Sequence, residues 1–356
     1  MGTMMLVYMI APMILFLVNI IYGRRNNSWL ILNGLLLLLF AGVTFLRVYI
    51  NLPSRNLLSI LISNGFWGII YELITLSDWN DFSNGDKKWL KLLLGCISVC
   101  AGAFIIGCIG EVHSKLSVKP TWQSISKQYS KSSEAPTFKR NETPVALAPN
   151  TVLNRVRKSM SDIPNSQYFD TPDTVQAQYY KGKPVYIIPL KYDGFFAMRR
   201  AQEIPGYFIV DATNQNAEPK FVKKPYKYAT SAYFNHDVDR QIYRNNPEWL
   251  TMSKPQLEIG DDGTPYWVQT VYKSETFSHR VNYQQLHVVV MNAQTGSQKT
   301  YSIKNLPKFI DEAITSDSAA QMNKVFGKYK HGFWNFSRTD VIKPTNNGPE
   351  DGVTSI

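Results

Sequence analysis

The chain has 356 residues, a net charge of +11 and a mean hydropathy of −0.19, which is ordinary for a water-soluble protein. That average combines two regions, because residues 1–110 are almost continuously apolar and residues 111–356 are polar. The composition therefore excludes a protein that is soluble throughout, and equally one that lies entirely in lipid.

Four apolar stretches divide the first 110 residues: 4–22, 29–50, 57–76 and 89–109. Each has about the 20 residues that a helix needs to cross the hydrocarbon core of a bilayer. We therefore predict an all-α transmembrane region of four helices. The third stretch contains Asn64, Gly65 and Gly68, so a re-entrant segment is the alternative there.

Polar side chains inside these stretches are candidate functional residues. A carboxylate buried in a membrane indicates function by default, which singles out Glu72. Glu72 lies one turn from the end of its stretch, so we favour the simpler interpretation that it reaches water. We expect Asn33 and Asn64, together with Asn19, to form hydrogen bonds between helices.

All three cysteines, Cys96, Cys100 and Cys108, lie in the fourth stretch. Cys96 and Cys100 are one turn apart, so they share a helix face, and thiols pack well against a neighbouring helix. We favour packing over metal binding there. The polar region has no cysteine and hence no disulfide. This is common in proteins that Gram-positive bacteria expose on the outer side of their membrane.

Short loops carry the signal for orientation, because cytoplasmic loops are enriched in Lys and Arg. The first and third loops and the adjoining helix start hold Arg24, Arg25, Lys87, Lys88 and Lys91, whereas the second loop region holds Arg47 and Arg55. We predict that the first and third loops face the cytoplasm. The polar C-terminal region then lies outside the cell, although Lys115 and Lys119 favour the opposite orientation.

Residues 111–150 are rich in Ser, Thr, Lys and Pro, which predicts a flexible basic linker. Within it, residues 122–130 have the pattern of a short amphipathic helix lying on the membrane. We expect Asn150 to cap a helix over residues 151–160.

The remaining pattern predicts a soluble α+β domain of antiparallel sheets with short helices, in two units (151–250 and 251–336) followed by a polar tail (337–356). The expected strands are 175–179, 185–190, 206–212, 256–259, 266–272, 286–292 and 299–303, with an extended segment at 220–228. The expected helices are 235–244, 310–315 and 319–328.

The two units resemble each other. The segment GKPVYIIPL at 182–190 parallels GTPYWVQTV at 263–271, and YFIVDATNQ at 207–215 parallels VVVMNAQTG at 288–296. Each pair has a Gly-x-Pro turn before one strand and an Asp/Asn-Ala turn after the next. This pattern predicts an internal duplication.

The same segments carry a family resemblance. Two motifs resemble the PepSY type of extracytoplasmic module. One is an aspartate-rich turn followed by a G-x-P-Y-W-V strand, and the other is a strand that ends in an A-x-T-G turn. Residues 261–268 and 289–296 match best, and Asn292 stands where the family usually has Asp. The resemblance implies an α+β domain that regulates, inhibits or scaffolds other proteins of the cell envelope, usually without catalysis.

The sequence shows no pattern typical of catalysis. The five histidines lack metal-ligand spacing, and neither a nucleophile motif nor a phosphate-binding loop is present. We predict a protein that is not an enzyme and needs no cofactor or metal. The candidate interaction residues are four lysines and two aromatic residues: Lys220, Lys223, Lys224, Lys227, Phe333 and Trp334. For the aromatic group at 331–336, we prefer the packed edge of the domain over a contact with another subunit.

Two functions fit these observations. The favoured one is a membrane-anchored, non-catalytic protein of the cell envelope whose exterior domain binds another protein or an anionic wall polymer. The alternative is a subunit of a transport or secretion assembly, in which Glu72 and the intramembrane asparagines are required. An oligomer is compatible with both, whereas nucleic acid is the least favoured partner.

Overall fold

The structure, a computed structural model, describes residues 2–22, 27–53, 56–76, 87–126, 147–173, 175–273 and 280–342. The chain forms two compact units: a helical one of residues 1–118, which two short later segments (247–249 and 274–281) join, and an α+β domain made of the rest of residues 119–356. Arg24, Arg25 and Arg55, which carry part of the orientation prediction, lie outside the described residues, as do the side chains of Lys87 and Lys88.

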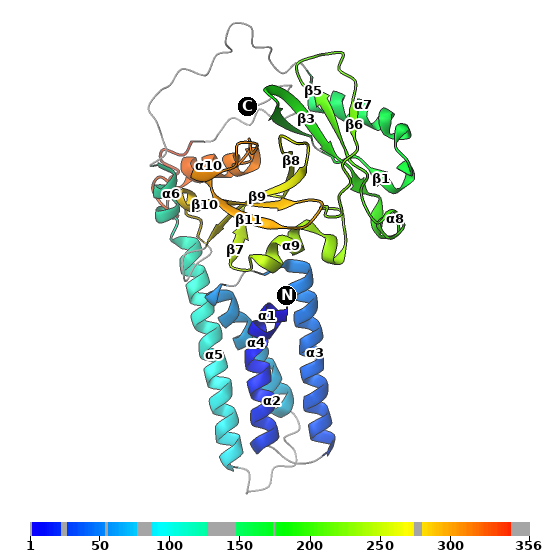
Figure 1. The fold of residues 1–356 in the computed structure, drawn as a ribbon. Helices are drawn as coiled ribbons and strands as arrows, with labels where there is room; N and C mark the ends of the chain where they lie inside the picture. Colours follow the sequence, from blue (N-terminus) through cyan, green and yellow to red (C-terminus); the bar gives the residue numbers. More distant parts are fainter. Residues whose placement is uncertain are drawn as a thin grey trace. The chain divides into compact units, whose positions relative to one another are not determined.

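The helical unit contains α1 (Gly2–Tyr8), α2 (Ile10–Tyr22), α3 (Asn27–Asn51), α4 (Leu57–Leu76) and α5 (Lys87–Leu116). Figure 1 shows α2 to α5 running alongside one another. Three helices, α3 to α5, are long and apolar enough to cross a membrane, and the bent pair of α1 and α2 gives a fourth if it counts as one span. By length and composition, the chain is a multi-pass membrane protein.

Sequence periodicity explains how these helices pack. The buried residues of α3 recur every three or four positions, so they form one stripe: Trp29, Asn33, Leu36, Phe40, Thr44 and Val48. The leucines between them point outward, and Leu38 is 70% exposed. This is the arrangement expected for helices whose outer faces contact lipid.

The irregular span is the first one and not the third. Helices α1 and α2 meet at a bend of 62°. Pro12 lies in the first turn of α2 and has no N–H to continue the preceding helix, which accounts for the break. The alternative of a re-entrant third stretch is therefore not observed, because α4 is a continuous helix of 20 residues.

Glycines on both α4 and α5 allow these two helices to pack closely. A Cβ atom added at Gly65 would lie 2.6 Å from the carbonyl oxygen of Cys100, and one at Gly107 would lie 2.7 Å from the side chain of Ile62. Small residues let helix backbones approach closely, and this is a main source of helix association in lipid. Cys100 is buried at this contact, as predicted for a packing residue.

The α+β domain contains short helices and two larger sheets. Its helices are α6 (Lys119–Ser126), α7 (Pro149–Ser159), α8 (Gly194–Ala201), α9 (Val238–Asn245) and α10 (Ser316–Lys328). Its strands are β1 (Phe169–Asp170), β2 (Gln176–Tyr180), β3 (Lys183–Pro189), β4 (Lys191–Tyr192), β5 (Tyr207–Asp211), β6 (Lys220–Val222), β7 (Trp249–Thr251), β8 (Gln256–Ile259), β9 (Pro265–Lys273), β10 (Leu286–Asn292) and β11 (Gln298–Ser302). The prediction of an α+β domain with antiparallel sheets is confirmed.

One sheet has the order β2-β3-β5-β6, and the other has the order β11-β10-β9-β7 with β8 also paired to β9. A short ladder joins β1 and β4. In the larger sheets β3, β9 and β10 form the centre of the core, since at least four consecutive residues of each strand are buried. All the pairings described by register are antiparallel.

The two sheets repeat several details. After β5, the N–H of Ala212 donates to the carbonyl of Pro184 at 3.1 Å, and after β10 the N–H of Ala293 donates to that of Pro265 at 3.0 Å. The registers also correspond, because β3 pairs Val185 with Asp211 as β9 pairs Tyr266 with Asn292. In each of these pairs, the residue of the second sheet lies the same number of positions after its counterpart in the first sheet.

An aromatic side chain makes the same bond in each half. The hydroxyl of Tyr186 on β3 donates to the carbonyl of Leu147 at 2.9 Å, and the indole N–H of Trp267 on β9 donates to the carbonyl of Tyr228 at 2.7 Å. The sequence separation between Leu147 and Tyr228 equals that between Tyr186 and Trp267. Each bond ties a central strand to the segment that precedes the helix of its half.

Three local expectations are wrong. The flexible linker over residues 111–150 is partly helical, because α5 continues to Leu116, α6 begins at Lys119 and α7 begins at Pro149. Residues 127–146 of this segment lie outside the described residues. Asn150 does not cap α7, since Ala148 holds the cap position and Pro149 occupies the first turn, where its missing N–H costs nothing.

The expected helix at residues 310–315 is also absent from the described residues, which are irregular there with a bend at residues 313–314. The buried carboxylate of Glu258 accepts the backbone N–H groups of Asp311 at 3.0 Å and Glu312 at 3.3 Å. This anchoring competes with helix formation, and α10 begins only after Thr315, whose hydroxyl accepts the N–H of Ser318.

Candidate functional sites

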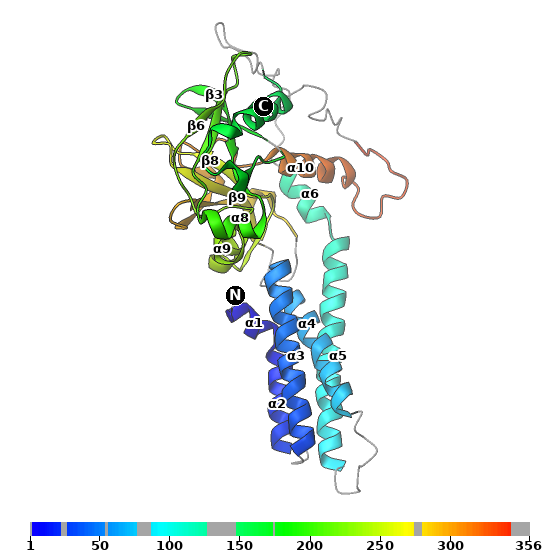
Figure 2. The same cartoon turned by 90° about the vertical axis from the view of Figure 1, so that its right-hand side faces the viewer.

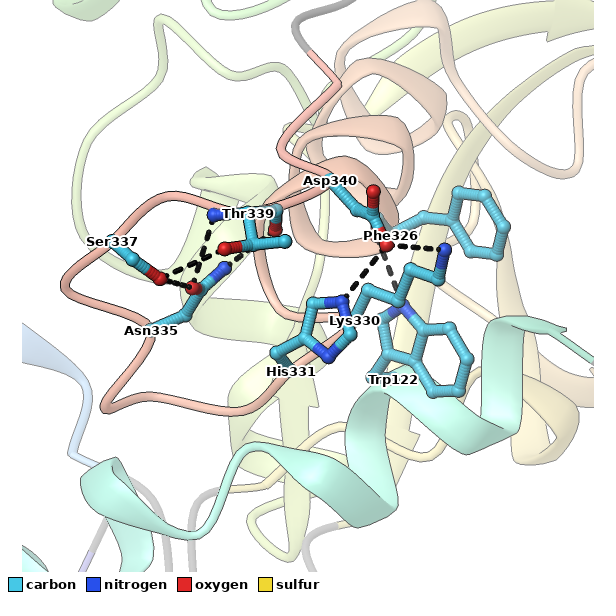
Figure 3. Close-up of polar contacts among 8 residues, drawn as sticks. All are labelled: Trp122, Phe326, Lys330, His331, Asn335, Ser337, Thr339 and Asp340. Carbon is cyan, nitrogen blue, oxygen red and sulfur yellow. Dashed lines mark hydrogen bonds and ion pairs between the residues drawn. The ribbon is translucent and has the colours of Figure 1, made fainter.

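The C-terminal segment after α10 forms a loop with a defined shape. The side chain of Asn335 accepts the N–H of Thr339 at 3.1 Å and donates to the carbonyl of Thr339 at 2.8 Å. The Ser337 hydroxyl donates to Asn335 at 3.2 Å (Figure 3). One asparagine therefore closes the turn over residues 335–339, as Asn side chains do in tight turns.

Charged side chains close the base of the same loop. The carboxylate of Asp340 contacts the Lys330 ammonium at 2.9 Å and the His331 ring nitrogen at 3.0 Å (Figure 3). The hydrogen bond from His331, followed by that from Lys330, lowers the pKa of Asp340. Beyond it, the N–H of Ile342 donates to the carbonyl of Gly327 at 3.0 Å, which returns the chain to α10.

This loop presents aromatic side chains to the outside. Phe333 is 40%, Trp334 62% and Phe336 79% exposed. The rings contact one another, with centroids 5.2 Å apart for Phe333 and Trp334 and 5.6 Å apart for Trp334 and Phe336. Our preference for a packed edge of the domain is therefore wrong, and Phe333 and Trp334 remain candidates for an interaction surface.

Helix α6 packs against α10, the helix that precedes this loop. The ring of Trp122 stacks on that of Phe326 in α10 at 5.8 Å, and its N–H donates to the Phe326 carbonyl at 2.9 Å (Figure 3). Both views of the fold show α6 and α10 side by side (Figures 1 and 2). The apolar side of α6, which we expected to lie on a membrane, thus packs within the domain.

The lysine segment follows the outer edge of the first sheet. β6 pairs only with β5 among the described strands, and Lys220, Lys223 and Lys227 are exposed while Lys224 is half-buried. Lys224 lowers the pKa of Asp262, after the larger effect of hydrogen bonds from Thr264. Lysines at a sheet edge either bind an anion or prevent association with other strands.

Exposed aromatic residues also gather near α8. The ring of Phe195 contacts those of Phe196, Tyr233 and Phe234 at 5.5 to 5.8 Å. Phe196 is 76% and Phe234 55% exposed, whereas Tyr186 and Tyr207 of the first sheet are buried. The sequence gives no signal for this cluster, because residue type alone does not separate an exposed aromatic side chain from a buried one.

Glu72 lies in a buried polar cluster between helices. Its side chain is fully buried, so the favoured interpretation that it reaches water is wrong. The Thr75 hydroxyl, one turn further along α4, donates to Glu72 Oε2 at 3.1 Å. Glu72 Oε1 has no hydrogen-bond partner among the described residues.

Asparagines connect this cluster to α2 and α3. The amide of Asn19 donates to Asn33 Oδ1 at 3.2 Å, and the hydroxyl of Tyr71 donates to the same oxygen at 2.9 Å. Asn33 in turn donates to the carbonyl of Trp29 at 3.0 Å. The predicted hydrogen bonding between helices is thus observed for Asn19 and Asn33.

Asn64 forms hydrogen bonds with backbone groups at the break between α1 and α2. Its amide donates to the carbonyls of Val7 and Ile60, each at 3.0 Å, and its oxygen accepts the N–H of Ala11 at 2.8 Å. A broken helix in lipid leaves backbone groups without partners, at a cost of several kcal/mol each. Asn64 supplies partners on both sides of the break.

Among the residues that the structure describes, no group of three or more His, Cys, Asp and Glu is placed to hold a metal ion. Comparison of the chain with protein-family models, with curated proteins and with solved structures found no match. The sites above are therefore interpreted from their own geometry.

Proposed function

We propose that this chain is a membrane-anchored binding protein of the cell envelope, whose α+β domain holds or regulates another protein and catalyses no reaction. The observation that carries this proposal is the aromatic loop of residues 329–342. Its three exposed rings stand on a turn that is fixed by side-chain hydrogen bonds.

Such a loop has the properties of a protein-binding element. Interfaces are enriched in Trp and Phe, and a few buried aromatic residues carry most of the binding free energy. A loop that already has its shape loses less conformational entropy on binding. The lysines of residues 220–227 offer a second, electrostatic surface, which suits an anionic partner such as a wall polymer or the acidic rim of a protein.

We also propose that the domain arose by duplication and that its two halves are PepSY-like units. The repeated proline–alanine hydrogen bonds, the matching registers and the repeated aromatic-to-carbonyl bond support this proposal. The helix preceding each sheet, α7 or α9, is consistent with it. Envelope regulators of this type act by contact, which agrees with a binding function.

For the orientation, we propose that the domain lies outside the cytoplasm. The support is the distribution of Lys and Arg among the short loops. Protease treatment of intact cells tests it. An exterior domain is removed from sealed cells, whereas a cytoplasmic domain is protected until the cells are lysed.

A second candidate function, a subunit of a transport or secretion assembly, is favoured by one observation. Glu72 is fully buried between helices and has an unused oxygen, whereas an inert anchor has no need of a buried carboxyl group. The test compares Glu72→Gln with replacement of all spans by an unrelated anchor. Under the binding proposal both proteins keep their function, and under the alternative both lose it.

Co-purification tests the binding proposal itself. The tagged full-length chain is extracted in mild detergent, and we expect a stoichiometric protein partner that is lost in Trp334→Ala. Tyr179→Ala is the matched control, because Tyr179 is an aromatic side chain of similar exposure (57%) on the edge strand β2, outside the loop. A partner retained equally by both variants would contradict the role of the loop.

A further inference from the structure

The cluster around Glu72 contains two buried oxygen atoms that lack a donor. Glu72 Oε1 and Asn19 Oδ1 have no hydrogen-bond partner among the described residues, and both side chains are fully buried. The two side chains lie beside each other, close enough to interact. Buried polar atoms in proteins are nearly always hydrogen-bonded, so two neighbouring acceptors without a donor require an explanation.

Among the described residues, no side chain donates a hydrogen bond to Glu72 Oε1 or to Asn19 Oδ1. The amide of Asn19 donates one N–H to Asn33, and its second N–H cannot serve its own oxygen. The Thr75 hydroxyl lies within hydrogen-bond distance of Glu72 Oε2 and of the Glu72 carbonyl, and the Tyr71 hydroxyl donates to Asn33. From α5, the titratable groups near Glu72 are the thiols of Cys96 and Cys100. Among the described residues, neither Glu72's own helix nor α2, α3 or α5 has a cationic side chain in contact with it.

A single hydrogen atom satisfies both oxygens. A neutral carboxylic acid has one O–H donor, whereas a carboxylate has none. If Glu72 carries a proton on Oε1, that O–H can donate to Asn19 Oδ1, and the Thr75 bond to Oε2 is unchanged. An ionised carboxylate without a cation in this apolar surrounding would instead be costly.

We propose that Glu72 is a proton-binding site within the helix bundle, and that the bound proton forms a hydrogen bond from α4 to Asn19 on α2. Loss of the proton removes this bond and leaves a buried negative charge facing Asn19. The site therefore couples protonation to the contact between α2 and α4. This inference is independent of the binding function of the α+β domain.

Infrared spectroscopy of the full-length protein in lipid nanodiscs tests the proposal. The difference spectrum of wild type and Glu72→Gln at pH 7 is expected to show the C=O band of a protonated carboxyl group, sensitive to deuterium exchange. Glu111→Gln is the matched control, because Glu111 is a carboxylate on α5 that pairs with Lys115 at 3.6 Å, and its difference spectrum should show carboxylate bands. Asn19→Val should shift the Glu72 band, since the acceptor is removed.

Carboxylate bands in the Glu72→Gln difference at pH 7 would overturn the proposal. So would a protonated band that is present in choline chloride but lost in sodium chloride, because a bound cation would then replace the proton. An unshifted band in Asn19→Val would overturn the link to α2. If the Glu72→Gln protein cannot be purified, the wild-type protein is titrated between pH 6 and 10 instead. A C=O band of a protonated carboxyl group at pH 7 that disappears at higher pH supports the proposal, and its absence at pH 7 overturns it.

Discussion

Each of the two units buries one glutamate completely, and the two carboxyl groups differ in their hydrogen bonds. In the α+β domain, Glu258 accepts two backbone N–H groups and thereby fixes the segment before α10. In the helical unit, Glu72 accepts one hydroxyl and keeps an oxygen without a partner. The comparison teaches that a buried carboxyl group is structural where its oxygens are used, and is a candidate for function where they are not.

The largest expected effect comes from removing the structural carboxylate. Glu258→Ala leaves two partly buried N–H groups without their acceptor and empties a fully buried site, so we expect a loss of about 3 kcal/mol in the free energy of unfolding. Glu72→Ala removes a group that contacts the Thr75 hydroxyl and no backbone N–H group, so we expect a smaller loss. Denaturant unfolding of both variants in the same detergent provides the measurement. Equal losses would remove the distinction between the two glutamates.

The close contact of α4 and α5 comes next. Gly65→Leu places a side chain against the backbone of Cys100, so we expect separation of the helices and a loss of about 2 kcal/mol. Gly42→Leu on α3 is the control, because a Cβ atom there meets nothing within 4 Å. The thermal stability of the two purified variants should differ clearly. Similar values would show that the glycines are not packing residues.

Asn64→Leu should cost a comparable amount or slightly less, about 2 kcal/mol, because it leaves the N–H of Ala11 without its acceptor at the helix break. Ser98→Leu is the control, since Ser98 is exposed on α5 and its hydroxyl bonds only to the carbonyl of Leu94 in its own helix. Proteolysis near the α1–α2 break is expected to increase in the first variant alone.

The pH dependence of stability sharpens the comparison further. Burial raises the pKa of Glu258 to about 7, against the opposing effect of the N–H groups of Asp311 and Glu312. Between the ordinary glutamate pKa and about 7, the folded domain therefore binds more protons than the unfolded chain. Stability should fall as pH rises through this window, on the order of 2–3 kcal/mol in total, and stay level above it.

Glu258→Gln should abolish this slope, because the amide does not titrate. Unfolding at pH 5, 6, 7 and 8 checks the expectation. A wild-type stability that stays level over this window would mean that burial does not raise the pKa of Glu258.

The smallest expected effect concerns the aromatic loop. Asp340→Asn removes the ion pairs to Lys330 and His331, which are solvent-exposed, so the unfolding temperature should hardly change. Hydrogen exchange of residues 329–342 should nevertheless become faster. Since the pKa of Asp340 is lowered, the wild-type contact should persist until the pH falls below the ordinary aspartate range. Unchanged exchange in the variant would show that Asn335 alone fixes the loop.

Sequence patterns predicted the elements whose period is long and regular. The strands at 256–259 and 286–292 coincide with β8 and β10, and Val238 and Ile242 lie buried on α9 as expected. The wrong predictions arose where a distant partner decides the local structure. Glu258 prevents a helix at residues 310–315, and Phe326 holds α6 within the domain.

The candidate sites were predictable only as residue types. Asn64 was recognised as an intramembrane hydrogen-bonding residue, but the break that it bridges depends on its distance from Val7 and Ala11, which are far away in sequence. Phe333 and Trp334 were recognised as aromatic, but their exposure depends on Asn335 and Asp340. No local signal distinguishes these side chains from those of a packed edge.

The central claim is that the α+β domain works by contact through its aromatic loop, and site-specific photo-crosslinking in living cells tests it most directly. A benzophenone amino acid is placed at residue 334 and, as the control, at residue 179. The account predicts one discrete crosslinked protein from residue 334 and none from residue 179. Identical products from both positions, or none from residue 334, would contradict it.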